Sequence, residues 1–517
     1  MPHSVGDSVS SVRRPMSLAG PVARPRRALR AWVVRRPLAL RAWLAAHGWS
    51  VVAIGLLGGC LLAEAAVVRT GIDDLDEGYF VQQAARVAVW GQVPYRDFES
   101  LYTPGLLYLH AALFWLLGGP NVLGPRLLAL LARAALAGLL YALARPLVRQ
   151  PLLAALPGLV LLGGFDAAPD RWEPHPGWLS SAFAVLATWC LSRRAVTARW
   201  LLGSGAAGAA AYVFKQNAGA FIMLAIVLRG LWPLLRAGWP LHRAALRHSL
   251  RDVGLPVAAF VACTLVWLGP LLVTLGGHIE RLGGFVGALS TAGLFAPPEP
   301  TLLIPLACLI GGLLLVRREA GWLLLAGGCL LMTQYPRMDT LHLAWSAPLL
   351  LVVGAAALAR APAQVVAASL ASVALLAVPV LNSRAGPLRT ERVAVAAGVE
   401  VPRATARDLQ GALDQIAQRT AAGEPIFVYP TSPLLYALAG RPNPTRFDHL
   451  NPGAATAAQI QATIADLERS DVRLVVVSDF WRAAWGPPGP NTTLEDWLAQ
   501  HYTPVATAGS YRVLARI

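Results

Sequence analysis

The sequence predicts a polytopic α-helical membrane protein, with about 11–13 transmembrane helices and a small C-terminal α/β domain outside the membrane. Of its 517 residues, 56% are hydrophobic and only 14% are charged, whereas soluble proteins carry about 25% charged residues. Apolar runs separated by short arginine clusters recur up to about residue 381, as in helices joined by cytoplasmic loops. For this reason the net charge of +16 does not indicate nucleic-acid binding. The five cysteines lie in apolar runs, so we expect small core residues, not disulfides or metal ligands.

The N-terminal segment, 1–46, is strongly basic. It holds nine arginines and a single acid, Asp7, and it has no long apolar run. We expect a cytoplasmic basic tail that sets orientation, and not a cleavable signal peptide, because no clear small-residue cleavage site follows the first apolar run.

A transmembrane domain is expected over 47–383. A spanning helix needs about 20 apolar residues, so the shorter runs have uncertain ends. The runs that could span are 48–67, 122–143, 151–165, 177–192, 200–213, 218–235, 254–275, 301–316, 321–334, 341–359 and 363–381.

The arginine clusters predict the sidedness of the loops. If all of them are cytoplasmic, a first outer loop at 68–103 and the part after 381 lie outside. One further run, 104–118, then disturbs the alternation: either it does not cross, or one arginine pair is outside, and we favour the first. Most loop acids fall on the outer side, whereas an ion-coupled transporter places them near the midplane. We therefore expect chemistry at the outer face of the membrane.

The C-terminal segment, 384–517, has the composition of a folded extracytoplasmic domain. Short β-rich runs occur at 426–429 and 472–478, and a last strand is expected at 511–517. Helical periodicity with mixed charge occurs at 404–420 and 454–470. This alternation predicts an α/β domain with some parallel pairing.

The first outer loop carries a recognisable series of motifs. It reads Asp-Glu-Gly-Tyr at 76–79, Gly-x-x-Pro-Tyr-Arg-Asp-Phe at 91–98 and Tyr-x-Pro-Gly at 102–105. This series resembles the opening of bacterial GT-C glycosyltransferases, relatives of protein O-mannosyltransferases and of the lipid A aminoarabinose transferase. The resemblance is specific over 71–118, weaker at 171–177, 214–219 and 337–342, and loose in the C-terminal domain.

The resemblance implies an inverting sugar transfer from a polyprenyl-phosphate donor on the extracytoplasmic side of a bacterial cytoplasmic (inner) membrane. The family's general base is an acid in the first outer loop, and Asp76, followed by Glu77, is the matching position. A carboxylate there can take the proton of an attacking hydroxyl. The alternative is that Asp76 only caps the helix that follows, and Asp73 and Asp74 are rivals for either role.

Four residues are candidates for binding the donor phosphate: Lys215, Arg337, His342 and Arg171. Lys215 is the only lysine among the 44 Lys and Arg residues, and a compact ammonium at an outer boundary suits a leaving phosphate. Its alternative role is that of an interfacial lysine whose amine reaches the headgroups. For the others the alternative is an interfacial anchor or a loop ion pair.

Asp97, Glu99, Tyr102 and His175 are candidates for binding the acceptor or a metal. Some relatives bind a divalent metal with an acid near this position and a distant histidine such as His342, but no ligand spacing here supports one. The alternative is a solvated loop. Three tryptophans are expected in the aromatic belt at the membrane interface: Trp172, Trp178 and Trp345.

The predicted function is glycosyl transfer onto a lipid, glycan or protein acceptor, with no nucleic-acid partner and no certain cofactor. Two alternatives stay open. A lipid-linked sugar flippase needs a polar path through the midplane, for which the sequence offers few residues. A non-catalytic assembly component would keep its function without Asp76.

Overall fold

A computed structural model describes residues 47–164, 174–237, 243–278, 300–316, 320–335, 338–372, 391–395, 398–450, 455–484 and 492–517. The chain divides into the units Met1–Val52 and Ala53–Ile517. The packing described below lies within the second unit.

Long apolar helices form the membrane part. Within the described residues, four helices are long and apolar enough to cross a bilayer: His47–Ala66, α4 (Leu123–Ala144), α8 (Gln216–Ala237) and α9 (Arg243–Thr274). A fifth crossing is formed if α13 (Thr340–Ser346) and α14 (Pro348–Leu358), bent by 75° at their junction, are one span. The remaining apolar helices are shorter: α3 (Gly105–Leu117), α5 (Pro151–Gly164), α6 (Pro176–Leu191), α7 (Ala198–Phe214), α11 (Leu303–Leu315), α12 (Gly321–Leu331) and Ala363–Ser372. Each apolar run of the sequence thus contains a helix, as expected for a multi-pass membrane protein.

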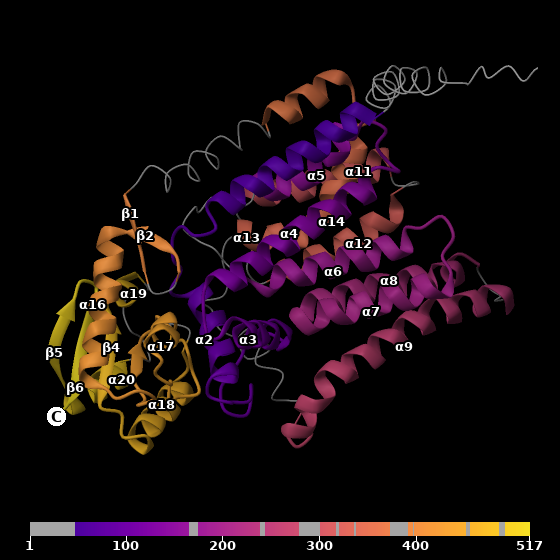
Figure 1. The fold of residues 1–517 in the computed structure, drawn as a ribbon. Helices are drawn as coiled ribbons and strands as arrows, with labels where there is room; N and C mark the ends of the chain where they lie inside the picture. Colours follow the sequence, from indigo (N-terminus) through magenta and orange to yellow (C-terminus); the bar gives the residue numbers. More distant parts are fainter. Residues whose placement is uncertain are drawn as a thin grey trace, which may run out of the picture. The chain divides into compact units, whose positions relative to one another are not determined.

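Small residues let the helices of this bundle approach closely. A Cβ at Gly205 of α7 would lie 2.0 Å from the carbonyl oxygen of Pro256 in α9. Small residues at such contacts are typical of membrane helices, where association depends on close packing. Figure 1 shows α6, α7, α8 and α9 running side by side.

Helix α3 corresponds to the ambiguous run 104–118. Its 13 residues span about 20 Å, less than the about 30 Å of a hydrocarbon core. Ala111 and Phe114 of α3 pack in one cluster with Val81 and Ala84 of α2 (Asp76–Ala88), in the first outer loop. Because other helices of the membrane part are as short, it is the packing against α2 that favours the interpretation of α3 as a helix that does not cross.

The C-terminal domain has a four-stranded sheet in the order β3-β4-β6-β5. β3 (Phe427–Tyr429) and β4 (Leu474–Ser478) are parallel, while β6 (Tyr511–Arg516) is antiparallel to β4 and to β5 (Tyr502–Ala508). The helices expected from the sequence are α16 (Arg403–Arg419) and α18 (Ala457–Arg469), and the expected strands are β3, β4 and β6; all are present. The elements not expected are β5, β1 (Arg392–Ala394), β2 (Glu400–Pro402), α17 (Leu434–Ala439), α19 (Asp479–Ala484) and α20 (Thr492–His501).

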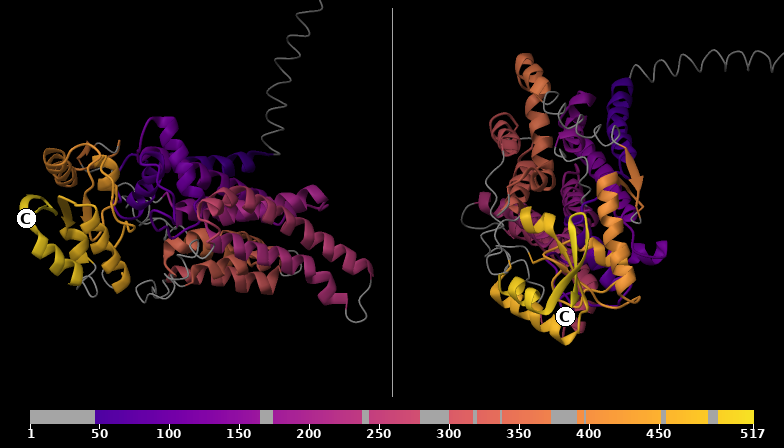
Figure 2. Two further views of the ribbon diagram at one scale, coloured as in Figure 1. Left: turned by 90° about the horizontal axis from the view of Figure 1, so that it is seen from below. Right: turned by 90° about the vertical axis from the view of Figure 1, so that its left-hand side faces the viewer.

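The C-terminal domain packs against the first outer loop. A Cβ at Gly78 of α2 would come within 2.9 Å of the Cβ of Leu434 in α17, so the two helices meet without a gap. Farther along, the amide of Gly71 donates to the carbonyl of Glu400 at 2.9 Å. Figure 2 shows the C-terminal elements, in orange and yellow, from two further sides. The loop that carries the predicted base is therefore held by both parts of the chain.

Candidate active site

The start of α2 carries four acids, and the structure gives three of them a structural partner. Asp73 lies just before the helix, and its Oδ1 accepts hydrogen bonds from the amides of Leu75 at 3.0 Å and Asp76 at 3.2 Å. The N-cap residue is Leu75, without a side-chain cap, and Asp76 is the first helical residue, which corrects the capping role considered for Asp76.

Asp74 holds the C-terminal domain. Its carboxylate accepts hydrogen bonds from the hydroxyl of Ser432, from the indole N–H of Trp481 at 3.0 Å and from the hydroxyl of Tyr511 at 3.3 Å. Burial raises the pKa of Asp74, although these hydrogen bonds act in the opposite direction. All three donors belong to the C-terminal domain, so we assign Asp74 to docking and not to proton transfer.

Glu77, expected beside Asp76 as a catalytic residue, is instead part of a buried ion pair. Its two oxygens lie 2.6 and 2.7 Å from the guanidinium nitrogens of Arg126, and neither side chain is exposed. Arg126 also donates to the backbone carbonyls of residues 68, 70 and 71. A carboxylate so occupied holds the loop in place, which makes Glu77 a structural residue.

Asp76 is the remaining acid. It is half-buried, and within the part of the chain that the structure describes no group donates a hydrogen bond to its carboxylate. A carboxylate that is not consumed by a structural partner can accept a proton from a bound substrate.

A second group of predicted residues converges at the breaks between membrane helices. His175 Nε2 lies 3.0 Å from the hydroxyl of Tyr102, and its ring stacks on Trp345 with the centroids 3.7 Å apart. The ammonium of Lys215 lies 4.6 Å from the centre of the Trp345 ring and 6.0 Å from that of Tyr102. The His342 ring lies 5.0 Å from that of Trp345. These residues, which we call the cation cluster, bring four of the sequence candidates together.

The local sequence explains why these side chains meet. His175 is the N-cap of α6 and accepts from the amide of Gly177 through Nδ1 at 2.9 Å. Lys215 ends α7, and Asp339 caps α13 and holds His342 Nδ1 at 2.7 Å. A Cβ at Gly177 would lie 2.2 Å from Trp345, so only glycine admits that ring. Polar side chains thus replace backbone partners at helix ends.

Helix α2 connects Asp76 with the cation cluster. The ring of Phe80 lies 5.9 Å from that of Tyr102 and 5.5 Å from that of His175. The hydroxyl of Tyr79 accepts from the amide of Leu101 at 3.1 Å, next to Tyr102. Phe80 follows Asp76 by about one helical turn, so Asp76 lies one turn along α2 from the aromatic ring that contacts the cation cluster.

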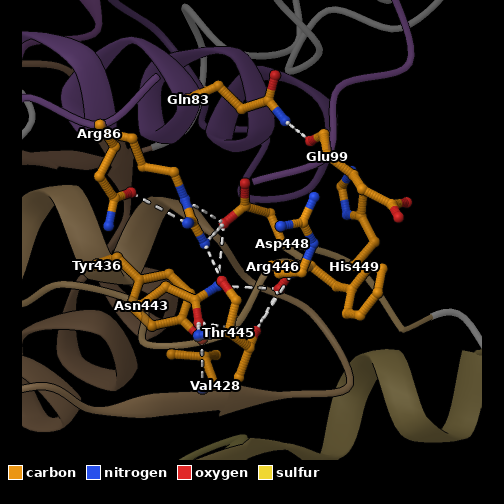
Figure 3. Close-up of polar contacts among 12 residues, drawn as sticks. Gln83, Arg86, Glu99, Val428, Tyr436, Asn443, Thr445, Arg446, Asp448 and His449 are labelled. Atoms are coloured by element: carbon orange, nitrogen blue, oxygen red, sulfur yellow. Dashed lines mark hydrogen bonds and ion pairs between the residues drawn. The ribbon is translucent and has the colours of Figure 1, made fainter. Parts of the chain in front are cut away.

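Asp97 and Glu99 take part in loop contacts. Asp97 pairs with Arg96 at 2.8 Å, and this guanidinium lowers the pKa of Asp97. The backbone of Glu99 accepts from Gln83 at 2.8 Å and donates to the carbonyl of Arg446 at 2.9 Å (Figure 3). Neither acid joins the cation cluster. Among the described residues no three His, Cys, Asp or Glu side chains gather as a metal site.

Two donor-phosphate candidates, Arg171 and Arg337, lie outside the described residues, as does Trp172. The other two tryptophans expected in the aromatic belt are buried, Trp345 at 4% and Trp178 at 3% exposure. Trp345 lines the cation cluster, and Trp178 packs edge-on against it at 6.0 Å. The expectation of an interfacial position failed because, in the sequence, a tryptophan next to a helix break looks the same as a tryptophan at the membrane interface.

Sequence reasoning missed the buried arginines of α4 and a histidine of the C-terminal domain. Arg133 pairs with Glu64 at 2.9 Å and lies 4.5 Å above the Trp178 ring. A charge inside an apolar run usually marks a function or a buried pair, and Arg126 and Arg133 are spaced by seven, on one helix face, which could have revealed them. His449 lies outside the apolar runs, and no sequence pattern marks it as a functional residue.

Comparisons with known proteins were made by sequence and by structure. No protein-family model and no curated sequence matches the chain. Its fold is similar to that of solved membrane glycosyltransferases, and this confirms the GT-C fold expected from the sequence. One is ArnT from Cupriavidus metallidurans bound to undecaprenyl phosphate, with 16% identity, a TM-score of 0.56, and coverage of 91% of this chain and 98% of that chain. Another is the arabinofuranosyltransferase AftD from Mycobacteria, with 15% identity, a TM-score of 0.51, and coverage of 91% of this chain and 40% of that one.

Proposed function

We propose that this chain is an inverting glycosyltransferase that moves a sugar from a polyprenyl-phosphate donor to an acceptor hydroxyl at the outer face of the cytoplasmic membrane. The observation that carries the proposal is the position of Asp76, whose carboxylate accepts no hydrogen bond among the described residues, on α2. The Phe80 ring of the same helix contacts the rings of Tyr102 and His175, which belong to the cluster that also holds the buried Lys215 and His342. The fold is shared with an enzyme that was solved with undecaprenyl phosphate bound, which supports the same class of lipid as donor.

In this mechanism the acceptor oxygen attacks the anomeric carbon while Asp76 takes its proton. The bond between that carbon and the phosphate oxygen breaks, and the polyprenyl phosphate leaves with the electron pair. A general base of this kind contributes about 10²–10⁴ in rate.

The leaving phosphate gains charge as the bond breaks, and the cation cluster would stabilise it. Lys215 supplies a point charge in a site closed by aromatic rings, where an electrostatic contact is stronger than in water. Tyr102, through its hydroxyl, and His342, through its ring, are further donors to a phosphate. His175 orients the Tyr102 hydroxyl, because its Nδ1 accepts from the amide of Gly177 and its Nε2 lies 3.0 Å from that hydroxyl. Arg171 and Arg337 remain candidates for the same role.

The flippase alternative gains no support from the buried charges. Arg133 is paired with Glu64 and Arg126 with Glu77, so both buried arginines are neutralised by a nearby acid. A transport path instead needs polar groups that a moving substrate can contact.

The test follows labelled sugar in membranes with and without the protein. Membranes are given radiolabelled nucleotide sugars so that their own enzymes build labelled polyprenyl-phosphate sugars, and the label is then followed from the lipid fraction into acceptor. We expect transfer only where the protein is present, and loss of it in Asp76→Asn. Asp414→Asn, which changes an exposed acid of α16, is the matched control. Equal transfer with and without the protein would refute the proposal.

A further inference from the structure

His449 of the C-terminal domain lies against the helix that carries Asp76. Its ring stacks on the Tyr79 ring, with the centroids 4.4 Å apart and the planes 20° apart. Its Nδ1 lies 3.0 Å from the hydroxyl oxygen of Thr431. The ring is thus fixed from two sides, by an aromatic face of α2 and by a hydrogen bond within its own domain.

Asp76 and His449 face the same space. Tyr79 follows Asp76 by three residues on α2, and residues three apart lie on one face of a helix. A ring stacked on Tyr79 therefore lies on the face that also presents Asp76. Within the described parts of the chain, no group makes a hydrogen bond to His449 Nε2 or donates one to the Asp76 carboxylate.

We propose that His449 is an acceptor-binding residue, which the C-terminal domain contributes to the active site of the proposed glycosyltransferase. Its Nε2 hydrogen-bonds the acceptor and holds the attacking hydroxyl at the Asp76 carboxylate. This inference rests on the proposed function and extends it, because the membrane part and the C-terminal domain then build the acceptor site together.

The protonation state of His449 fits this role. Burial lowers the pKa of the imidazole, while the charges of Asp76 and Asp448 raise it. The effect of Asp448 is reduced because Arg86 pairs with it at 2.9 Å, and Tyr79 is neutral because burial raises its pKa. A neutral ring that donates from Nδ1 to Thr431 presents Nε2 as an acceptor for a second hydroxyl of the acceptor substrate, so that the proton of the attacking hydroxyl is left to Asp76.

The docking contacts keep His449 in place. Figure 3 shows His449 beside Asp448, whose carboxylate is held by Arg86 of α2 and by Asn443 at 3.0 Å. The loop that bears His449 is therefore attached to α2 directly through its neighbouring residue. A substitution at His449 removes a hydrogen-bonding group without removing this attachment.

The first experiment measures the placement, independently of activity. The pKa of His449 is followed by NMR of ¹⁵N-histidine-labelled full-length protein, assigned by the loss of one signal in His449→Gln. Replacing Asp76 by Asn removes a nearby negative charge that raises the His449 pKa, so we expect this pKa to fall. An unchanged His449 pKa would refute the inference that Asp76 and His449 lie at the same face of α2.

The second experiment measures the role. Labelled donor made in the membranes is consumed either by transfer to acceptor or by hydrolysis, and the two products are counted separately. In His449→Ala we expect the ratio of transfer to hydrolysis to fall about 3- to 10-fold, the value of one neutral hydrogen bond. His449→Gln, which keeps a hydrogen-bonding group, should restore part of it, and His501→Ala should change nothing.

The outcomes separate this inference from the proposed function. If the wild-type protein transfers no label at all, the proposed function fails and the acceptor role of His449 fails with it. If the wild type transfers and His449→Ala lowers transfer and hydrolysis equally, the proposed function stands and His449 is only structural.

Discussion

Arg86 offers the sharpest test of the interface between α2 and the C-terminal domain. Its guanidinium donates to Asp448 Oδ1 at 2.9 and 3.1 Å, to the carbonyl of Thr445 at 2.9 Å and to the side chain of Gln92 at 3.1 Å. The side chains of Arg86 and Asp448 are 1% and 0% exposed. Replacing Arg86 by Ala leaves Asp448 buried, with Asn443 as its remaining hydrogen-bond donor among the described residues.

The expected loss of docking free energy is large because the Asp448 carboxylate stays buried without its charged partner. Removing one partner of a buried ion pair costs about 3–5 kcal/mol. This free energy corresponds to an increase of about 100- to 1,000-fold or more in the open fraction of the interface. The matched control is Arg96→Ala in the same loop, because the Arg96–Asp97 pair is solvent-exposed and such pairs contribute little.

The assay measures local opening, because a polytopic protein does not unfold in a single two-state step. Hydrogen exchange of the C-terminal domain, read by mass spectrometry on purified protein in detergent, reports the open fraction directly. We expect faster exchange around residues 443–450 in Arg86→Ala and wild-type exchange in Arg96→Ala. The double variant Arg86→Met, Asp448→Leu should recover part of the protection, because an apolar pair has no charge to desolvate.

Equal exchange in Arg86→Ala and Arg96→Ala would refute the reasoning. It would mean that Asp448 reaches solvent or another cation when Arg86 is absent, and that the domain is held by its other contacts.

Four further predictions concern the base, the phosphate site, the pH dependence of docking and the topology of the chain. Asp76→Asn should lower transfer by about 10²–10⁴ without changing the thermal midpoint, since Asp76 does not cap α2; normal turnover would exclude Asp76 as the base. Lys215→Ala should weaken binding of undecaprenyl phosphate, measured by titration in detergent, and Lys215→Arg should recover only part; unchanged binding in Lys215→Ala would exclude the phosphate role. Asp74 has a raised pKa in the docked state, so its contribution to docking is complete below its ordinary value of 3.8 and is lost as the pH rises through the raised pKa; exchange at the interface should increase with pH in the wild type and less so in Asp74→Asn. In a background without the native cysteines, a cysteine at Gln418 should react with an impermeant thiol reagent from outside and one at Ala198 should not; the reverse result would invert the topology.

The sequence alone determined the membrane fold, through its apolar runs and the motifs of its first outer loop. Apolar runs of sufficient length must bury their backbone polar groups as helices in a bilayer, so each run predicted a helix. The motifs of the first outer loop indicated the GT-C fold, which the structural comparison confirmed. The same local patterns placed β3, β4, β6, α16 and α18 of the C-terminal domain, whereas its other helices and the strands β1 and β2 were not predicted. β5 was also missed, because Pro504 weakens its strand signal.

The candidate site was predictable in its members but not in its pairings. Lys215, Tyr102, His175 and His342 were identified because polar residues at the ends of apolar runs are conspicuous in a sequence. Whether a carboxylate has a hydrogen-bond or ion-pair partner depends on residues far away in the chain, and a local sequence pattern does not show which distant residues meet.

The acids of α2 show what only the tertiary structure decided. Asp74 is bound by Ser432 and its neighbours, 358 residues away in the chain, and Glu77 by Arg126, 49 residues away. Asp76 differs from them only in having no such partner among the described residues. Asp74 and Glu77 hold the loop in place because a buried polar or charged group needs a partner. Asp76, for which the described residues provide none, is the residue that the sequence motif indicated as the base.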